Sequence, residues 1–169
     1  MSEDIRIGVF VCDCGTNIAG VVDVPQLVAY ARGLENVVFA DEGRWSCSVD
    51  YLARMKDSIQ EHKLNRVVIS ACTPRTHEPL FKRTAKEAGI NPYLLEFVSI
   101  REQVSWVHMK EPEIATEKAK DLVKMGVAKA ALLEEGEEIR LPVKTDCLII
   151  GGGMAGMNAA LSVAHQGFN

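Results

Sequence analysis

The sequence predicts an α/β fold in which a doubly wound, mostly parallel sheet carries helices on both faces, a Rossmann-like three-layer arrangement. Short apolar segments that suit strands alternate with amphipathic segments that suit helices along most of the chain. The strand candidates at residues 5–11 and 66–71 are apolar almost throughout, as expected of strands buried on both faces. Repeated strand–helix units favour parallel strands whose connecting helices cover the sheet.

The first half of the chain contains two strand–helix units. Residues 5–11 are rich in β-branched side chains and predict the first strand. A helix is expected after Asp23, which can accept hydrogen bonds at the helix start, with Pro25 in the first turn. Residues 36–40 predict a second, short strand, and Ser48 can cap the helix that follows it.

The second half of the α/β region adds two more units. Residues 66–71 predict the third strand, and Thr73 with Pro74 begins the next helix. Residues 93–98 predict the fourth strand, and a long helix is expected over residues 113–131. Each predicted strand is therefore followed by a helix, as a parallel sheet requires.

Four of the five cysteines fall where predicted strands end or helices begin. Cys12 and Cys14 lie at the end of the first strand, Cys47 lies between the second strand and its helix, and Cys72 ends the third strand. In a parallel sheet these positions share one edge, where open α/β proteins bind their ligands. Cys47 and Cys72 also directly precede helices, whose free N–H groups favour thiolates. We therefore expect the four sulfur atoms to gather at one edge of the sheet.

Four converging thiols allow several interpretations. They can ligate an iron–sulfur cluster, which takes cysteine ligands from distant parts of a sequence. They can bind structural zinc, although zinc sites usually contain paired Cys-x-x-Cys motifs and this chain has a single Cys-x-Cys. They can form a thiol–disulfide pair, although a bridge within Cys-x-Cys is strained. Otherwise they are small buried hydrophobic side chains near strand ends. The iron–sulfur cluster is the leading hypothesis.

The composition narrows the class of protein. The 19 Lys and Arg residues against 23 Asp and Glu give a net charge of −4, which argues against a nucleic-acid partner. No apolar run approaches the roughly 18 residues of a membrane span, and the acidic start at residues 1–4 is unlike a signal peptide. We therefore expect a cytoplasmic protein without membrane insertion, whose cysteines bind metal or carry redox chemistry rather than form structural disulfides.

The last 25 residues contain a second motif. Residues 147–150 predict a strand that runs into a Gly-x-Gly-x-x-Gly turn, made by Gly151, Gly153 and Gly156, and a helix through residue 166 follows. This order is typical of a dinucleotide-binding fold. The acidic residue that binds the ribose is expected roughly 20 positions further on, beyond residue 169, so we interpret the chain as a piece of a longer protein. Cys147, inside the predicted strand, is interpreted as a core residue.

A lone strand–turn–helix cannot bury its apolar face or satisfy its strand edges. We therefore expect this element to pack on the preceding domain or on a second copy of the chain, which makes a homodimer one expected assembly.

Five segments in this order resemble the amino-terminal region of the A subunit of heterodisulfide reductase and its relatives in methanogens and sulfate reducers. The resemblance covers almost the whole chain, and its most specific part is residues 71–81. The segments are VFVCDCGTNI (9–18), WSCS (45–48), SACTPRTHEPLF (70–81), NPYLLEFVSIREQVSWVH (91–108) and IIGGGMAGM (149–157).

The resemblance implies an oxidoreductase, an iron–sulfur flavoprotein in which this small domain precedes a thioredoxin-reductase-like FAD domain. It implies electron transfer that reduces a disulfide, with flavin-based electron bifurcation in some members. The implied partners are other heterodisulfide reductase-type subunits and hydrogenase or other electron-donor and electron-acceptor proteins. Because the rest of the FAD domain and the ferredoxin-like motifs of the family are absent from this sequence, no catalytic residue is expected in it.

The resemblance also gives roles to residues and boundaries to domains. It makes Cys12, Cys14, Cys47 and Cys72 the candidate ligands of a [4Fe-4S] cluster, and it makes Gly151, Gly153 and Gly156 the start of the FAD site. The predicted organisation is a cysteine-containing α/β domain over residues 1–133, a linker over 134–143 and the first βα unit of an FAD-binding Rossmann domain over 144–169. The alternative is a non-redox docking or assembly domain whose cysteines hold zinc or no metal.

Two further groups of side chains accompany the cysteines. Arg75 and His77 follow Cys72 and can donate hydrogen bonds to cluster sulfur or tune its potential, although a solvated first helical turn explains them equally well. A denser polar and aromatic patch is interpreted as a docking surface for the flavin domain, with an ordinary helix start as the alternative; it consists of Arg101, Glu102, Gln103, Trp106 and His108.

Overall fold

The chain forms two compact units, which adjoin between Gly136 and Glu137. The computed structural model describes residues 4–168, so residues 1–3 of the acidic start and residue 169 of the predicted second domain lie outside it. The finer boundaries of the predicted linker, 134–143, stay a prediction.

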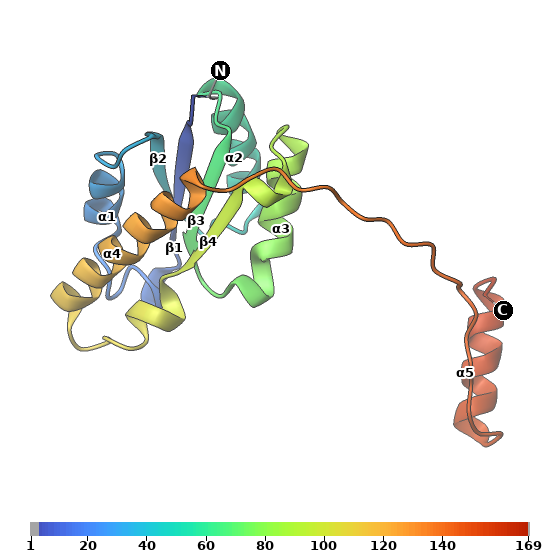
Figure 1. The fold of residues 1–169 in the computed structure, drawn as a ribbon. Helices are drawn as coiled ribbons and strands as arrows, with labels where there is room; N and C mark the ends of the chain where they lie inside the picture. Colours follow the sequence, from blue (N-terminus) through green and yellow to red (C-terminus); the bar gives the residue numbers. More distant parts are fainter. Residues whose placement is uncertain (1–3, 169) are drawn as a thin grey trace. The chain divides into compact units, whose positions relative to one another are not determined.

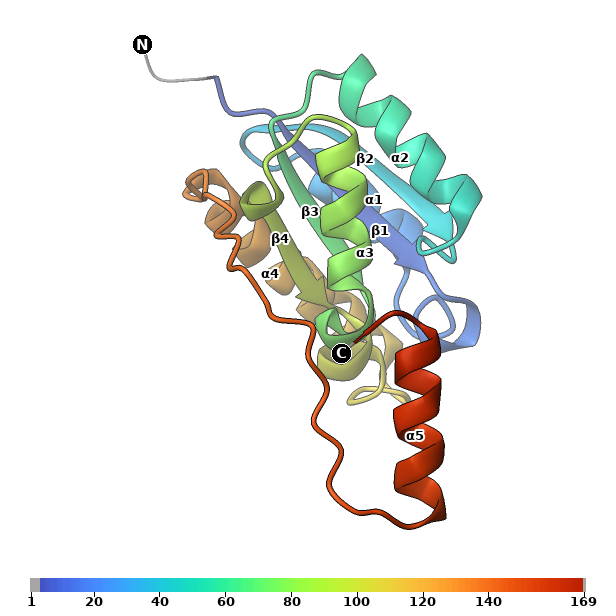
Figure 2. The same cartoon turned by 90° about the vertical axis from the view of Figure 1, so that its right-hand side faces the viewer.

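The first unit is built on a four-stranded sheet in which the neighbouring strands are all parallel, in the order β2-β1-β3-β4. Helices α1 and α4 cover one face, and α2 and α3 cover the other (Figures 1 and 2). The predicted doubly wound α/β fold is therefore confirmed. The strands are β1 (Ile7–Asp13), β2 (Val37–Arg44), β3 (Arg66–Ala71) and β4 (Leu95–Ser99), and the helices are α1 (Val24–Ala31), α2 (Val49–Glu61), α3 (Pro74–Glu87) and α4 (Pro112–Ala131).

The two central strands carry most of the sheet's core. Every residue of β3 is buried, and β1 is buried from Ile7 through Cys12. A strand covered by helices on both faces has no polar side, which explains why these two segments are apolar without alternation. The predicted bounds of β3 match the structure, whereas β1 begins and ends two residues later than predicted.

The edge strand β2 is longer than predicted, since it continues from Ala40 through Arg44. Its additional residues are polar or glycine, and they pair with the second half of β1, down to Asp13 against Arg44. An edge strand is partly solvated, so its sequence does not need the apolar run that marks the central strands. Pairing along β1, rather than side-chain hydrophobicity, sets the length of β2.

The predicted helix caps are present. The Asp23 carboxylate accepts a hydrogen bond from the Gln26 N–H at 2.9 Å, and the Ser48 hydroxyl accepts one from the Tyr51 N–H at 3.4 Å. The Thr73 hydroxyl accepts a bond of 3.4 Å from the Arg75 N–H at the start of α3. These contacts satisfy N–H groups that have no partner inside the helix. They also fix the points at which the chain turns from each strand edge into its helix.

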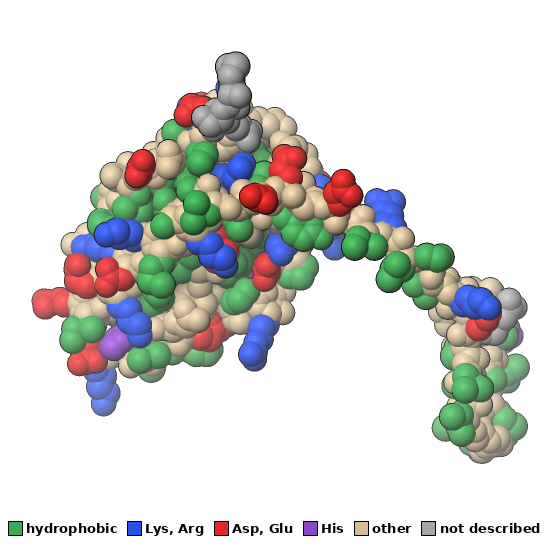
Figure 3. Space-filling view, in the orientation of Figure 1, with side chains coloured by type: hydrophobic (Ala, Val, Ile, Leu, Met, Phe, Trp, Pro, Cys, Tyr) green, Lys and Arg blue, Asp and Glu red, His purple; other side chains and the backbone are tan. Residues whose placement is uncertain are grey.

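The second unit contains one helix, α5 (Met154–His165), among the residues described. The strand predicted at residues 147–150 is not formed, because an isolated segment has no neighbouring strand to pair with. Cys147, interpreted from the sequence as a core residue, is consequently exposed. Apolar side chains stand at the surface of this unit (Figure 3), with Leu148 84% and Ile150 90% exposed. Across the whole described range, no helix has the length and apolarity needed to cross a membrane.

Candidate metal centre

The cysteine positions gather around the carboxyl ends of the central strands. The chain leaves β1 toward β2 on one side, through α1, and leaves β3 toward β4 on the other, through α3. The adjacent ends of β1 and β3 therefore form the topological switch point at which open α/β sheets bind ligands. Cys12 is the last residue but one of β1, Cys14 follows that strand directly, and Cys72 directly follows β3. Cys47 lies in the turn after β2, the other neighbour of β1.

The four thiols differ in their access to solvent. Cys12 is 4% exposed and Cys72 is 9% exposed, whereas Cys14 is half-buried and Cys47 is exposed. All four are free cysteines rather than disulfides. The Cys12 sulfur accepts a hydrogen bond from the Ser46 N–H at 3.5 Å, which joins the end of β1 to the turn that carries Cys47. Buried Ser46, which the sequence reasoning missed, is flagged only by its place beside Cys47.

The structure does not close these thiols into a finished ligand set. Within residues 4–168, no group of three or more His, Cys, Asp or Glu side chains is arranged to hold a metal ion. The four cysteines share one edge of the sheet, but a common coordination sphere for their sulfur atoms stays a prediction.

Burial keeps the inner thiols protonated in the metal-free chain. The pKa of Cys12 is raised to about 11, mainly by burial, with hydrogen bonds from Ser46 opposing the shift and the nearby Cys14 and Cys47 adding to it. The pKa of Cys72 is also raised, first by burial, while the positive charge of Arg101 lowers it. A bound metal cation replaces the thiol protons and neutralises the thiolates. The donor set, four thiols at the ligand-binding edge, thus has the chemistry that an iron–sulfur cluster requires.

Alkylation should reveal the difference between buried and exposed thiols. In the metal-free chain at pH 8, iodoacetamide should modify Cys47 at least about tenfold faster than Cys12, because the thiolate is the nucleophile and roughly a thousandth of Cys12 is deprotonated at three pH units below its pKa. Raising the pH toward 11 should speed the reaction of Cys12. Peptide mass spectrometry measures both rates. Equal rates at pH 8 would contradict the burial and the raised pKa of Cys12.

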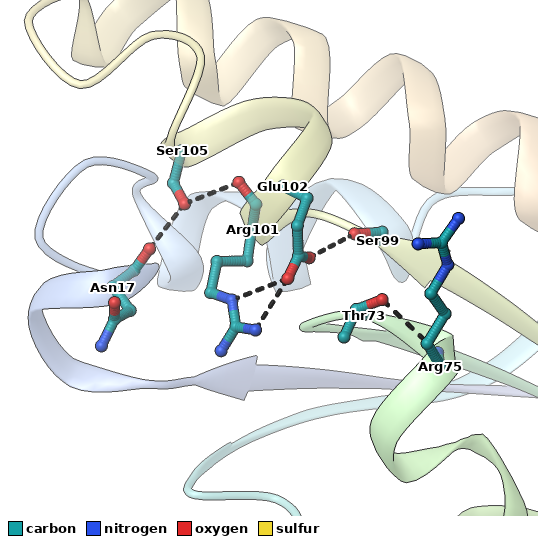
Figure 4. Close-up of polar contacts among 7 residues, drawn as sticks. All are labelled: Asn17, Thr73, Arg75, Ser99, Arg101, Glu102 and Ser105. Atoms are coloured by element: carbon teal, nitrogen blue, oxygen red, sulfur yellow. Dashed lines mark hydrogen bonds and ion pairs between the residues drawn. The ribbon is translucent and has the colours of Figure 1, made fainter.

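A charged side-chain network lies at the end of β4, beside β3 (Figure 4). Oε1 of Glu102 accepts hydrogen bonds from Nε of Arg101 at 3.1 Å and from one of its terminal nitrogens at 2.7 Å. The Ser99 hydroxyl donates to Oε2 of Glu102 at 2.8 Å. The Arg101 guanidinium also lies over the Trp106 ring, 4.6 Å from its centroid. Part of the polar and aromatic patch expected from the sequence is therefore one connected unit, while its predicted role as a docking surface stays a prediction.

Arg75 is arranged differently from Arg101. It is exposed in the first turn of α3, and its side chain extends away from Arg101 (Figure 4). A solvated first helical turn accounts for this position. His77, also on α3, is half-buried.

Comparison with known proteins was decisive for the family, although no family model matches the chain. The chain is 53% identical over 166 residues to a Methanopyrus kandleri protein, the second iron–sulfur A subunit of CoB–CoM heterodisulfide reductase by name, covering 98% of this chain and 25% of that protein. It is 53% identical over 166 residues to the A subunit of the H(2):CoB-CoM heterodisulfide,ferredoxin reductase of Methanothermobacter marburgensis, with the same two coverages. This chain is homologous to the A subunit of heterodisulfide reductase. The resemblance found in the sequence is confirmed.

The heterodisulfide reductase A homology extends beyond these two organisms. The A subunit of the Ferredoxin/F(420)H(2)-dependent CoB-CoM heterodisulfide reductase of Methanosarcina acetivorans is 51% identical over 164 residues, covering 97% of this chain and 21% of that protein. The chain thus spans about a quarter of the length of the curated relatives it matches. These relatives are named as reductases, and the name of the Methanopyrus protein includes the term iron–sulfur.

The glycine motif of this heterodisulfide reductase A homologue has its expected backbone features. Gly151 has a φ of +115°, which other residues rarely adopt. A Cβ on Gly156 would lie 1.9 Å from the Gly151 carbonyl oxygen, so the first turn of α5 packs against the glycine loop too closely for a side chain. Gly153 directly precedes α5. A glycine loop that leads into a helix N-terminus suits a pyrophosphate.

Proposed function

We propose that the chain is the electron-transfer module of a heterodisulfide reductase A-type iron–sulfur flavoprotein in the cytoplasm. The observation that carries this proposal is the placement of four free cysteines at the carboxyl edge of a parallel sheet, with two of them at its switch point. Cys12, Cys14, Cys47 and Cys72 would hold a [4Fe-4S] cluster, and the name of the Methanopyrus relative supports this assignment. When bound, such a cluster supplies one-electron transfer.

The chain's own residues would give this site three properties. Cys12 and Cys72 are buried, which keeps two of the four ligands out of water. Exposed Cys47 and half-buried Cys14 leave a side open to an electron-transfer partner. Gly151, Gly153 and Gly156 would start the site of the FAD to or from which electrons pass in the whole protein.

The whole protein would act as an oxidoreductase in disulfide reduction or in flavin-based electron bifurcation. Its partners would be other heterodisulfide reductase-type subunits and hydrogenase or other proteins that donate or accept electrons. The relatives' names, each of which designates one component of a reductase, support a complex of several subunits. The 169-residue chain would supply the cluster and the beginning of the flavin site rather than the catalytic centre.

Iron and acid-labile sulfide analysis tests the proposal. After anaerobic preparation or reconstitution, the chain should contain about four iron atoms and four sulfide ions, as a [4Fe-4S] cluster requires. A signal from the reduced cluster in electron paramagnetic resonance should accompany them. Zinc without sulfide, or neither metal, would overturn the proposal in favour of a docking or assembly domain.

A further inference from the structure

Arg101 is placed beside Cys72 by the pairing of two strands. In the register of β3 and β4, Ala71 lies opposite Ser99. The Ile100 N–H then donates to the Ala71 carbonyl oxygen at 2.8 Å, which extends the pairing past the end of β4. Cys72 is therefore the next residue on one strand, and Arg101 follows Ile100 on the other. The two belong to the same edge although they are far apart in the sequence.

The backbone that carries Arg101 is fastened to the loop after Cys14. Arg101 begins a π-helical turn, Arg101–Ser105 (η3). The hydroxyl of Ser105, a fully buried residue, lies 2.5 Å from the Asn17 carbonyl oxygen and 3.2 Å from that of Arg101 (Figure 4). Asn17 ends the short 3₁₀ turn Gly15–Asn17 (η1), which follows Cys14 directly. The turn bearing Arg101 is thus fixed against both cysteine-bearing loops at the switch point.

The guanidinium is held as firmly as its backbone. Its paired bonds to Glu102 and its stacking on Trp106 restrict it on two sides, and its side chain is only 22% exposed. Glu102 is itself anchored by Ser99, on β4. Because a guanidinium does not lose its proton in proteins, the result is a permanent cation in a defined place.

The cation acts electrostatically on the thiols. After burial, Arg101 is the largest influence on the pKa of Cys72, and its direction favours the thiolate, while Glu102 acts in the opposite direction. Cys72 and Cys14 in turn raise the pKa of Arg101. A fixed positive charge stabilises whichever state of a neighbouring group carries more negative charge.

We propose that Arg101 is a positioning residue for the redox site, whose clamped charge beside Cys14 and Cys72 raises the reduction potential of the cluster held there. The inference rests on the proposed function. Reduction adds one electron from a donor, such as dithionite in a titration, and forms or breaks no bond in the chain. Since the site becomes more negative by one charge, Arg101 favours its reduced state, and Glu102 partly opposes this effect.

A redox titration of the reconstituted full chain, followed by electron paramagnetic resonance, tests the inference. At the midpoint potential of the wild-type chain, Arg101→Gln should lower the ratio of reduced to oxidised cluster by about tenfold, equivalent to about 59 mV for one electron. Arg75→Gln is the matched control, because it removes an equal charge, close to Cys72 in the sequence, from an exposed side chain that points away from Arg101. It should change the ratio less than about twofold. Arg101→Lys, which keeps the charge, should shift the ratio less than Arg101→Gln.

Glu102→Gln provides a test of opposite sign. It removes the opposing negative charge, so the ratio of reduced to oxidised cluster should rise several-fold. If Arg101→Gln fails to retain iron, this variant decides, and a ratio that does not rise overturns the inference. An unchanged ratio in iron-loaded Arg101→Gln, or equal changes in Arg101→Gln and Arg75→Gln, also overturns it. These results leave the proposed function intact, whereas a wild-type chain without iron and sulfide would overturn both.

Discussion

Replacing Cys72 with serine is expected to remove most of the iron bound by the chain and to leave its secondary structure intact. Cys72 directly follows β3 at the switch point, and a serine oxygen does not replace the thiolate that an iron–sulfur cluster takes as its ligand. The sheet does not need this side chain, since every residue of β3 before it is already buried in the apolar core. Iron analysis and far-ultraviolet circular dichroism measure the two effects.

Cys147→Ser is the matched control for this substitution. Cys147 is the one cysteine in the second unit, and its thiol is exposed. The same atom replacement there should change the iron content little. Equal loss of iron in the two variants would show that the division between ligand cysteines and Cys147 is wrong. A loss of helical signal in Cys72→Ser would instead show that the fold depends on this thiol.

The central part of the fold could be predicted because burial on both faces leaves a strong mark in the sequence. The run RVVISA becomes β3 at the predicted residues, and its neighbour β1 shows the same pattern. The end of β2 could not be predicted in this way. Residues Asp41 to Arg44 are strand only because β1 lies beside them, and pairing with a distant segment has no local signature.

The same distinction holds for the candidate site. The positions of Cys12 and Cys72 followed from the parallel topology alone, because strand ends in such a sheet share an edge. The closeness of Arg101 to Cys72 depends on the register of β4 against β3 and on the hydrogen bond of Ile100 to Ala71. Neither is encoded in spacing along the chain, so the sequence indicated a polar patch around Arg101 without its relation to the cysteines.

The second unit carries the strongest apolar exposure in the described chain outside any strand or core. No residue of α5 is buried, and Met154 and Leu161 are 76% and 58% exposed. Leu148 and Ile150, in the segment that was predicted as a strand, are more exposed still. Covering this much apolar surface is favourable at about 25 cal/mol per Å². We therefore expect the unit to associate with another protein surface in solution.

The last prediction is that the 169-residue chain self-associates through residues 144–169 and does not bind FAD stoichiometrically at micromolar concentration. The glycine turn and the start of α5 offer contacts to a pyrophosphate, but the acidic group for the ribose is expected further along such a fold than residue 169. A single phosphate-binding turn thus supplies only part of the binding free energy. Light scattering should find dimers that disappear when residues 144–169 are deleted and persist in Ile114→Lys, which alters an apolar side chain of the first unit that is 52% exposed. Fluorescence titration should show no saturable FAD binding in the micromolar range. Tight stoichiometric FAD binding would mean that these residues already form a complete flavin site, and dimers that survive the deletion would place the self-association surface on the α/β unit.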